Sequence, residues 1–420
     1  MKHVHPLTTA GSGWLKSPGR WGILLLILGL ATYCLMPVWA APTSTYDSLR
    51  LYTEALFEIS QKYVWPKNEE DLIYGSLRGM MNSLDPDSSF LTAKEYQDYR
   101  QGQAKVPAEA GVELIVKDNL LTVASVIDGG PAARAGLKPG DHFLKIDDQL
   151  VRNLTTQEAA RRFQGAPGAA IKLQALRNGE VKPLDLTIKL EPLTSATVTT
   201  SFPAPDVAYV RLRYFNNDTP VELAAALNNL KARQPSVSGI ILDVRNNARG
   251  SMEQAVRSAS LLLGNQKVVL AKGRAAKTEE AYTGKDRDLV FKQTPRLVVL
   301  VDQGTARAAE IMAGALRDQG RATLLGAKTL GLCGLTKAFP LDDGSALVMT
   351  VAQCYTPKGE KIQGKGLEPE VPGQTPKPDK EKTPEPPKDL TPDQDPWVRQ
   401  AVELIIAGKP KPVAPKNDKS

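Results

Sequence analysis

Histidine and cysteine are both scarce in this sequence, with three of each among 420 residues. Two of the histidines fall within the first five residues, so only His142 is placed to act as a base in a folded domain. The cysteines lack the close spacing of zinc ligands, and they are too few for a disulfide-rich scaffold. We therefore expect a protein with no metal centre and no other cofactor.

A strong excess of charge is also missing. The chain has 53 basic and 46 acidic residues, a net charge of +7, and three of the basic residues precede position 41. The remaining +4 is spread over the rest of the chain and does not indicate a nucleic-acid-binding surface, so we expect no nucleic-acid partner. With 42% hydrophobic residues, the chain is long enough for two or three domains that each have a core.

One apolar run has the length of a membrane span. Residues 21–40 contain no charged side chain, and only positive charges precede them, which predicts that the N-terminus stays in the cytoplasm and the remainder is exported. Residues 1–41 are therefore either a single-pass inner-membrane anchor or a signal segment. Val38–Ala40 resembles a cleavage site, whereas the run is long for a signal peptide. We expect a cell-envelope protein that faces the periplasm, or a periplasmic one if the signal is cleaved.

The exported part predicts a mixed α/β protein of several domains. Near-continuous apolar strands such as Gly239–Val244 alternate with helices such as Met252–Leu263, which is typical of a parallel sheet covered by helices. The helix near the C-terminus could dock on the body or bind a partner. The expected parts are a helical N-terminal domain at 42–106, a strand-rich domain at 107–192, an α/β core at 193–371, a proline-rich linker at 372–396, and a short helix with a basic tail at 397–420.

The strand-rich domain contains the string Pro131–Asp141, PAARAGLKPGD, between predicted strands. Exported domains with this order of elements resemble PDZ domains. The resemblance implies that protein or peptide C-termini add a strand to the sheet edge, with their carboxylate held by amides of the loop around Gly111. A PDZ domain that only positions its neighbours is the other interpretation. His142 is expected to begin a strand and to have a structural role. The candidate peptide-binding residues are Gly111, Val112, Glu113 and Leu114.

The order of helical domain, PDZ domain and α/β core resembles that of the C-terminal processing peptidases, also called tail-specific proteases. The resemblance runs from about Tyr46 to Val371. Three of its specific strings are Leu242–Asn247, a string that begins with Glu310 and Ile311, and Gly364–Pro369. It implies a mixed α/β fold in which the PDZ domain precedes a peptidase-like core. Members of this family cut peptides with a Ser–Lys dyad, in which a desolvated lysine takes the proton of a serine at the start of a helix.

This sequence departs from the family pattern at both dyad positions. Arg307 stands at the nucleophile position and Leu332 at the base position, with the family spacing of 25 residues intact. A leucine has no group that accepts a proton, and a guanidinium is neither a nucleophile nor a base. The family's Asn-Asn-Pro-Gly-Gly loop near the oxyanion hole also differs, because Ala248 and Arg249 replace its proline and first glycine. We expect Arg307 to be solvated or paired with a carboxylate.

The resemblance therefore implies an exported, catalytically inactive pseudopeptidase that binds protein C-termini, pairs with an active relative and regulates it, or forms a homo-oligomer. An alternative is an active serine-type endopeptidase with relocated catalytic groups, for which Thr305 and Lys328 are the candidates. Thr305 is more simply explained as a helix N-cap and Lys328 as a solvated loop residue. A structural envelope scaffold that makes contacts through its proline-rich tail is a third possibility.

Two further hypotheses concern the region of the missing dyad. Arg249 and Arg307 stand in loops expected to face each other, and they would form either a small basic pocket for a carboxylate or two solvated side chains. Cys333 and Cys354 are equidistant from a hairpin turn at Asp342–Gly344, so a symmetric hairpin would bring them within reach of a disulfide. An exported location would let the bond persist. The alternatives are reduced thiols or a hairpin slipped by one residue.

Overall fold

The computed structural model describes residues 45–407 with internal gaps at 86, 102–106, 118–119, 152–155, 194–195, 234–236, 275–278, 292–294 and 375–390. The apolar segment 21–40, expected to be an anchor or signal, lies outside the described residues, as do most of the proline-rich linker and the basic tail. Among the helices that are described, none combines the length and the apolar character needed to cross a bilayer.

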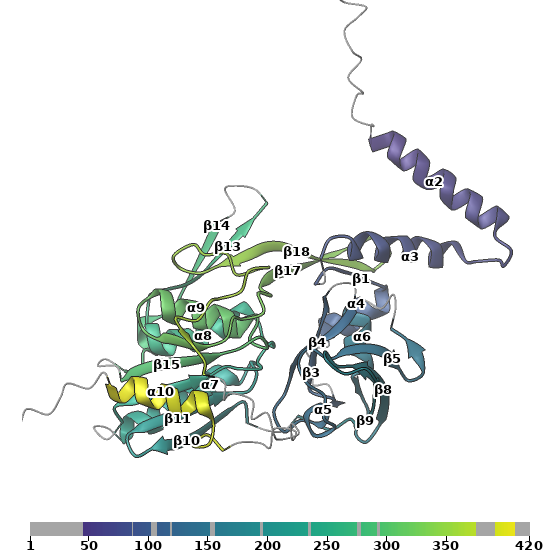
Figure 1. The fold of residues 1–420 in the computed structure, drawn as a ribbon. Coiled ribbons are helices and arrows are strands. Elements are labelled where there is room, and N and C mark those ends of the chain that lie inside the picture. Colours follow the sequence, from purple (N-terminus) through teal and green to yellow (C-terminus); the bar gives the residue numbers. More distant parts are fainter. Residues whose placement is uncertain are drawn as a thin grey trace, which may run out of the picture. The chain divides into compact units, whose positions relative to one another are not determined.

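The N-terminal region is helical, as expected (Figure 1). The chain divides into two compact units between Ile73 and Tyr74, so the first helix and the start of the second belong to a unit separate from everything that follows. Three acidic side chains in the first turn of the second helix favour its formation, because they lie at the positive end of the helix dipole. The elements are α2 (Thr45–Lys62), α3 (Glu69–Asn82), β1 (Ser89–Leu91) and α4 (Ala93–Gln101).

The strand-rich domain is an antiparallel sheet with strand order β3-β4-β5-β8-β9, to which β6 adds by pairing with β5. In this sheet β3 is an edge strand that pairs only with β4. His142 begins β5, and its Nδ1 lies 2.8 Å from the hydroxyl of Thr122, in agreement with a structural role. The elements are β2 (Ala108–Glu109), β3 (Val112–Lys117), β4 (Leu120–Val126), α5 (Pro131–Arg134), β5 (His142–Ile146), β6 (Gln149–Leu150), α6 (Thr156–Arg162), β7 (Gln164–Gly165), β8 (Ala170–Leu176) and β9 (Leu184–Lys189).

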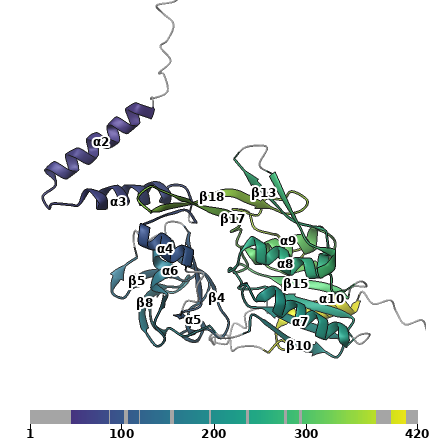
Figure 2. The ribbon, with the colours of Figure 1, turned by 180° about the vertical axis from the view of Figure 1, so that it is seen from behind.

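The α/β core has a sheet of order β10-β11-β12-β15-β16-β19, parallel from β11 onward. Alternate side chains face opposite layers: Ile240 and Leu242 pack with α7, α8 and α9, whereas Ile241 packs with α10. The two views show α7 and α10 on opposite sides of this sheet (Figures 1 and 2). The elements are β10 (Val198–Ala204), β11 (Val207–Leu212), α7 (Thr219–Ala232), β12 (Gly239–Asp243), α8 (Met252–Leu263), η1 (Asp286–Asp288), β15 (Arg296–Val301), α9 (Ala308–Asp318), β16 (Thr323–Gly326), β19 (Val371–Pro372) and α10 (Pro396–Ala407).

The C-terminal helix α10 docks on this chain rather than standing free, which decides between the two roles left open by the sequence. Its buried residues Val398, Ala401 and Ile405 cover the face of the sheet opposite α7–α9. Asp395 caps the helix by accepting hydrogen bonds from the backbone N–H groups of Trp397 and Val398, at 2.8 and 3.3 Å.

A second sheet lies beside the core and contains the predicted hairpin. Its path is β1-β18-β13-β14, and β17 also pairs with β18. The elements not yet given are β13 (Lys267–Gly273), β14 (Glu279–Thr283), β17 (Gly334–Pro340) and β18 (Ala346–Tyr355).

The predicted disulfide between Cys333 and Cys354 is present, with the two Cα atoms 5.5 Å apart. The hairpin is not fully symmetric, however. Near the turn Pro340 faces Ala346, a register that would leave the two cysteines one residue out of step. The register shifts by one residue between Thr336 and Leu335, where β18 accommodates Val351 as an extra residue. This bulge brings the cysteines opposite each other.

Candidate functional site

The nucleophile position lies at the start of α9, where Arg307 occupies the N-cap with φ of 53° and ψ of −119°. A positive φ is uncommon for a residue with a side chain, and it turns the chain sharply between β15 and the helix. The backbone N–H of Arg307 donates to the carbonyl of Leu332 at 2.9 Å. The two residues that the resemblance assigns to the dyad positions are therefore adjacent in this structure.

The Arg307 side chain is paired with a carboxylate, one of the two environments expected for it. Its Nη2 donates to Oδ1 of Asp87 at 2.7 Å. Burial alone would lower the pKa of Arg307, but the charge of Asp87 outweighs it and the pKa is raised. Asp87 comes from the turn before β1. Sequence analysis gave no role to that turn, because nothing in it signals a partner so far along the chain.

The base position is apolar and closed. Leu332 is 8% exposed and packs in a cluster with Ile115, Ala124, Ala248 and Ala306. The first two of these come from strands β3 and β4 of the strand-rich domain, and the other two from loops of the core.

Glu310 fixes the backbone of the base position from inside α9. It is fully buried, and its carboxylate accepts hydrogen bonds from the hydroxyl of Thr329 and from the N–H groups of Gly331 and Leu332, the latter two at 2.7 and 3.0 Å. Burial raises the pKa of Glu310 to about 7, even though these donors favour the charged form. The sequence placed Glu310 in a family string without indicating this supporting role.

Arg249, in the loop after β12, binds two carboxylates of the strand-rich domain. Its Nη1 and Nη2 donate to Glu109 at 2.9 and 2.8 Å, and its Nε donates to Glu113 at 2.5 Å. Its guanidinium also lies over the ring of Tyr214 at 5.7 Å. Burial would lower the pKa of Arg249, but the two glutamates raise it. The basic pocket proposed from the sequence is therefore filled by carboxylates of this chain.

The two alternative catalytic candidates are not joined. Thr305 is buried, and its hydroxyl lies 3.0 Å from the carbonyl of Val244 and 3.1 Å from the carboxylate of Asp302. Lys328 is exposed and lies 3.5 Å from Glu368. No hydrogen bond or ion pair links Thr305 to Lys328 among the described residues. The expectation that Thr305 caps the helix is wrong, because α9 begins two residues later than expected and Thr305 belongs to the preceding turn.

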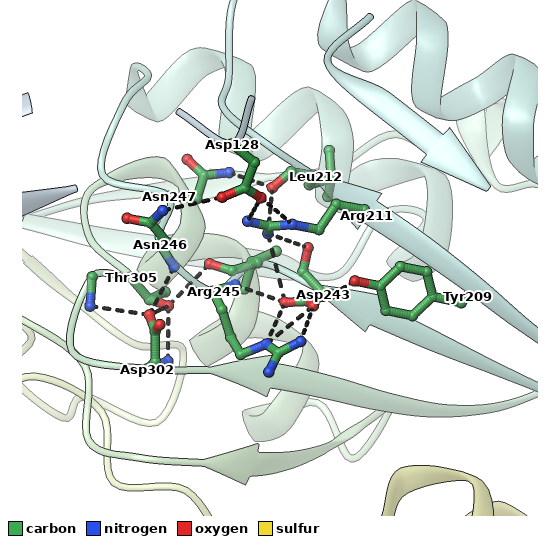
Figure 3. Close-up of polar contacts among 12 residues, drawn as sticks. Asp128, Tyr209, Arg211, Leu212, Asp243, Arg245, Asn246, Asn247, Asp302 and Thr305 are labelled. Carbon is green, nitrogen blue, oxygen red and sulfur yellow. Dashed lines mark hydrogen bonds and ion pairs between the residues drawn. The ribbon is translucent and has the colours of Figure 1, made fainter. Parts of the chain in front are cut away.

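Asp243, at the carboxyl end of β12, is the centre of a buried ionic cluster (Figure 3). It accepts a hydrogen bond from the hydroxyl of Tyr209 at 2.7 Å and from Arg245 at 2.6 Å, and a guanidinium nitrogen of Arg211 lies 3.6 Å away. Burial would raise the pKa of Asp243, but the two arginines lower it strongly. This carboxylate therefore stays charged and serves as the anchor of both arginines.

The cluster extends in two directions from Asp243. Arg211 pairs with Asp128 of the strand-rich domain at 2.5 Å, and Arg245 pairs with Asp395, the cap of α10, at 2.7 Å. A cavity of about 500 Å³ lies beside it. Within the described residues, no group of His, Cys, Asp and Glu side chains could hold a metal ion. Because every carboxylate of the cluster already binds an arginine or a backbone donor, its arrangement is that of a structural brace.

The candidate peptide-binding residues lie together at one edge of the sheet of the strand-rich domain, where Gly111, Val112 and Leu114 are buried and Glu113 is half-buried. Gly111 precedes β3 with φ of 73°, and its carbonyl accepts the N–H of Ile127 at 2.8 Å. Val112 and Leu114 pack into the domain core, whereas Glu113 points the other way and reaches Arg249. The strand's outer edge has no partner strand in the described structure.

Comparisons with known proteins agree with this arrangement. The model of the PDZ domain family matches residues 109–189, and that of Peptidase family S41 matches residues 206–372. A carboxy-terminal-processing protease of Bartonella bacilliformis is 33% identical over 341 residues, which are 81% of this chain and 78% of that protein. The carboxy-terminal processing protease CtpA of Bacillus subtilis is 31% identical over 334 residues, covering 79% and 70% of the two chains.

A solved structure, that of a photosystem II D1 C-terminal processing protease, superposes with a TM-score of 0.65 at 27% identity. The match covers 76% of this chain and 86% of that one. The mixed α/β fold, with a helical N-terminal region, a PDZ domain and an S41 core, is thus shared with these proteins. The chain belongs to the family of PDZ-containing carboxy-terminal-processing proteases of Peptidase family S41.

Proposed function

We propose that this chain is a non-hydrolytic member of its family that binds protein C-termini through its PDZ domain. The observation that carries the proposal is the identity of two side chains, Arg307 and Leu332, at positions whose backbone is still held together. The N–H of Arg307 bonds to the carbonyl of Leu332, and Glu310 supports the neighbouring backbone. The scaffold of a dyad is kept, but neither side chain can attack a carbonyl or take a proton.

An active peptidase with relocated groups is the competing function. It would need a hydroxyl activated by a neutral amine, and Thr305 and Lys328 are the candidates for that pair. The structure argues against it, since the hydroxyl of Thr305 is engaged inside a turn and the ammonium of Lys328 is exposed beside Glu368.

Peptide binding is supported by the position of β3 as the last strand of its sheet and by the glycine loop that precedes it. A peptide that adds to this edge would gain backbone hydrogen bonds, while the amides near Gly111 would hold its terminal carboxylate. We place the protein in the cell envelope, with residues 21–40 as an anchor or a cleaved signal. Its partners would be proteins with accessible C-termini, an active relative, or a second copy of the chain.

Hydrolysis is tested by incubating the full-length protein with an unstructured protein substrate, beside the Bacillus subtilis relative as a reference. We expect no cleavage by this chain under conditions in which the reference cleaves. Cleavage that disappears in Thr305→Ala or Lys328→Ala would contradict the proposal and support the relocated pair.

Peptide binding is tested by titrating the full-length protein with C-terminal peptides and with the same peptides carrying a C-terminal amide. We expect amidation to weaken binding at least about tenfold, because it removes the charge that the loop amides recognise. Gly111→Ala should also weaken binding, since its backbone has a positive φ. Gly179→Ala is the matched control, because Gly179 has a similar φ of 88° in a turn remote from β3. Equal affinity for free and amidated peptides would leave only a positioning role for the domain.

A further inference from the structure

The positions at which this chain departs from its family share one structural property. Arg249, Arg307 and Leu332 all lie in the α/β core, yet each contacts a segment that precedes the core in the sequence. Arg249 and Leu332 contact the PDZ domain, and Arg307 contacts the turn at Asp87. Loss of peptidase activity alone would not explain why all three replacements contact the PDZ domain or the Asp87 turn.

The charges in this region balance through those contacts. Glu109 and Glu113 lie on either side of the Gly111 loop, and both carboxylates are largely buried against Arg249. Without that guanidinium, two carboxylates would face the core with no cation between them, which disfavours close approach of the PDZ domain. A glycine, which the family has here, supplies no such charge.

The apolar contact of Leu332 also joins the PDZ domain to the core. Leu332 fills the space between Ile115 and Ala124 of the PDZ sheet and Ala248 of the core. A lysine at this position would bring an ammonium group among these apolar side chains, which is costly. The leucine allows the two surfaces to meet without water between them.

We propose that Arg249, Arg307 and Leu332 act as a clamp that fastens the PDZ domain and the Asp87 turn onto the core, over the position of the missing dyad. The outer face of β3 and β4, with Glu113, Ile115 and Ala124, then occupies the space in front of Leu332. The replacements convert a catalytic centre into a domain interface. This inference concerns the attachment of the PDZ domain and holds whether or not the domain binds peptides.

A single backbone amide reports on the clamp. The N–H of Val126, at the end of β4, donates to the side chain of Asn246 in the core at 2.9 Å. The N–H of Val123, three residues earlier in the same strand, donates to Asp141 within the PDZ domain at 2.9 Å. The exchange rate of the first amide therefore follows attachment of the domain to the core, and the second follows the stability of the domain itself.

The test is residue-resolved hydrogen–deuterium exchange of the full-length protein. In Arg249→Gln and in Leu332→Ser we expect the Val126 amide to exchange at least about tenfold faster than in the parent, with Val123 unchanged. Arg249→Lys should have an intermediate effect, because lysine keeps the charge but cannot form the fork with Glu109. Arg257→Gln, at an exposed position of α8 with no ion pair in the described structure, is the matched control and should change neither amide.

A second variant series separates the clamp from general destabilisation. If Arg249 acts through Glu109 and Glu113, then Arg249→Gln combined with Glu109→Gln and Glu113→Gln should exchange at Val126 no faster than Arg249→Gln alone. The clamp is refuted if Val126 keeps its parental rate in both single variants. It is also refuted if Val123 accelerates as much as Val126, since the residues would then stabilise the PDZ fold and not its attachment.

Discussion

Two ionic regions of this molecule are built in different ways. The cluster around Asp243 takes Tyr209 and Arg211 from the neighbouring strand β11 and Arg245 from the turn after β12, so these three partners lie within 34 residues of the central carboxylate. The former dyad centre takes its partners from far away: Arg307 and Asp87 are 220 residues apart, and Arg249 and Glu109 are 140 apart.

The difference separates what the chain shares with its family from what is its own. The Asp243 cluster contains the string Leu242–Asn247, which carried the family resemblance, and it braces the carboxyl ends of the core strands. The long-range pairs use arginines at positions where the family has a serine and a glycine. We call the first the scaffold region, because it contains a string that carried the family resemblance; it also reaches the strand-rich domain, through Asp128. The second joins parts of the chain that lie farther apart in the sequence.

The largest effect is expected from breaking the scaffold region. Asp243→Asn removes the buried charge that holds Arg211 and Arg245, and leaves both guanidiniums short of a partner. We expect a loss of about 3–5 kcal/mol in the free energy of unfolding, measured by urea denaturation. Asp98→Asn, an exposed position on α4 with no ion pair in the described structure, should change stability by less than about 0.5 kcal/mol. If Asp243→Asn and Asp98→Asn lowered the free energy of unfolding equally, the cluster around Asp243 would have no special part in stability.

The disulfide beside Leu332 gives a second stability test, now in the region around Arg307 and Leu332. Replacing Cys333 and Cys354 together by serine frees a loop whose ends are 21 residues apart, and we expect a loss of about 3 kcal/mol in the free energy of unfolding. Cys34→Ser, outside the described residues, is the control and should leave the free energy of unfolding unchanged.

Deleting Val351 tests the bulge directly. The deletion removes the extra residue and leaves Cys354 opposite Cys333 in a regular ladder, so mass spectrometry should still find the disulfide.

Glu310 makes the stability of the former centre depend on pH. Its pKa rises from 4.5 to about 7 on folding, so the folded state binds the extra proton between those values. The stability contributed by Glu310 is full below pH 4.5 and is lost as pH rises through 7. We expect the melting temperature of the parent to fall over this interval relative to that of Glu310→Gln, which cannot ionise. Glu253→Gln, at an exposed site, should run parallel to the parent, and a parallel course for Glu310→Gln would contradict the argument.

The smallest effect concerns the outer end of the scaffold cluster. Asp395→Asn keeps a helix-capping side chain but removes the ion pair with Arg245, so we expect a loss of at most about 1 kcal/mol in the free energy of unfolding. Asp395→Ala removes the cap as well and should cost about 1 kcal/mol more. If both variants lose the same amount in thermal denaturation, the ion pair carries the whole contribution and the cap carries none.

Much of the fold was predictable from local patterns. The continuous apolar run before Asp243 predicted a buried parallel strand, and β12 is that strand. Hairpin geometry brought a Cys333–Cys354 bond within reach but left reduced thiols and a slipped hairpin open, and the structure contains the bond. The bulge at Val351 was not foreseen, because a register shift leaves no periodic signal.

The sequence predicted that the serine and lysine of a dyad are absent from the site, but it did not predict which residues contact their replacements. The family spacing marked Arg307 and Leu332 as departures, and the structure places the backbone of the two residues side by side. Their partners could not be inferred, because Asp87 and Ile115 reach the site only through the packing of separate domains. Thr305 was misplaced for a local reason, since Asp302 closes a turn that delays the start of α9.

Strand β18 sets an order in which the parts of this chain can assemble. Its first half pairs with β1 near residue 90, and its second half pairs with β13 near residue 271. During synthesis, the segment that contains Asp87 and β1 therefore waits for residues 346–355 before it has a strand to join, whereas the PDZ domain can form from contiguous sequence. A chain that stops before residue 346 would hold a finished PDZ domain between an N-terminal segment and a core that cannot yet be connected.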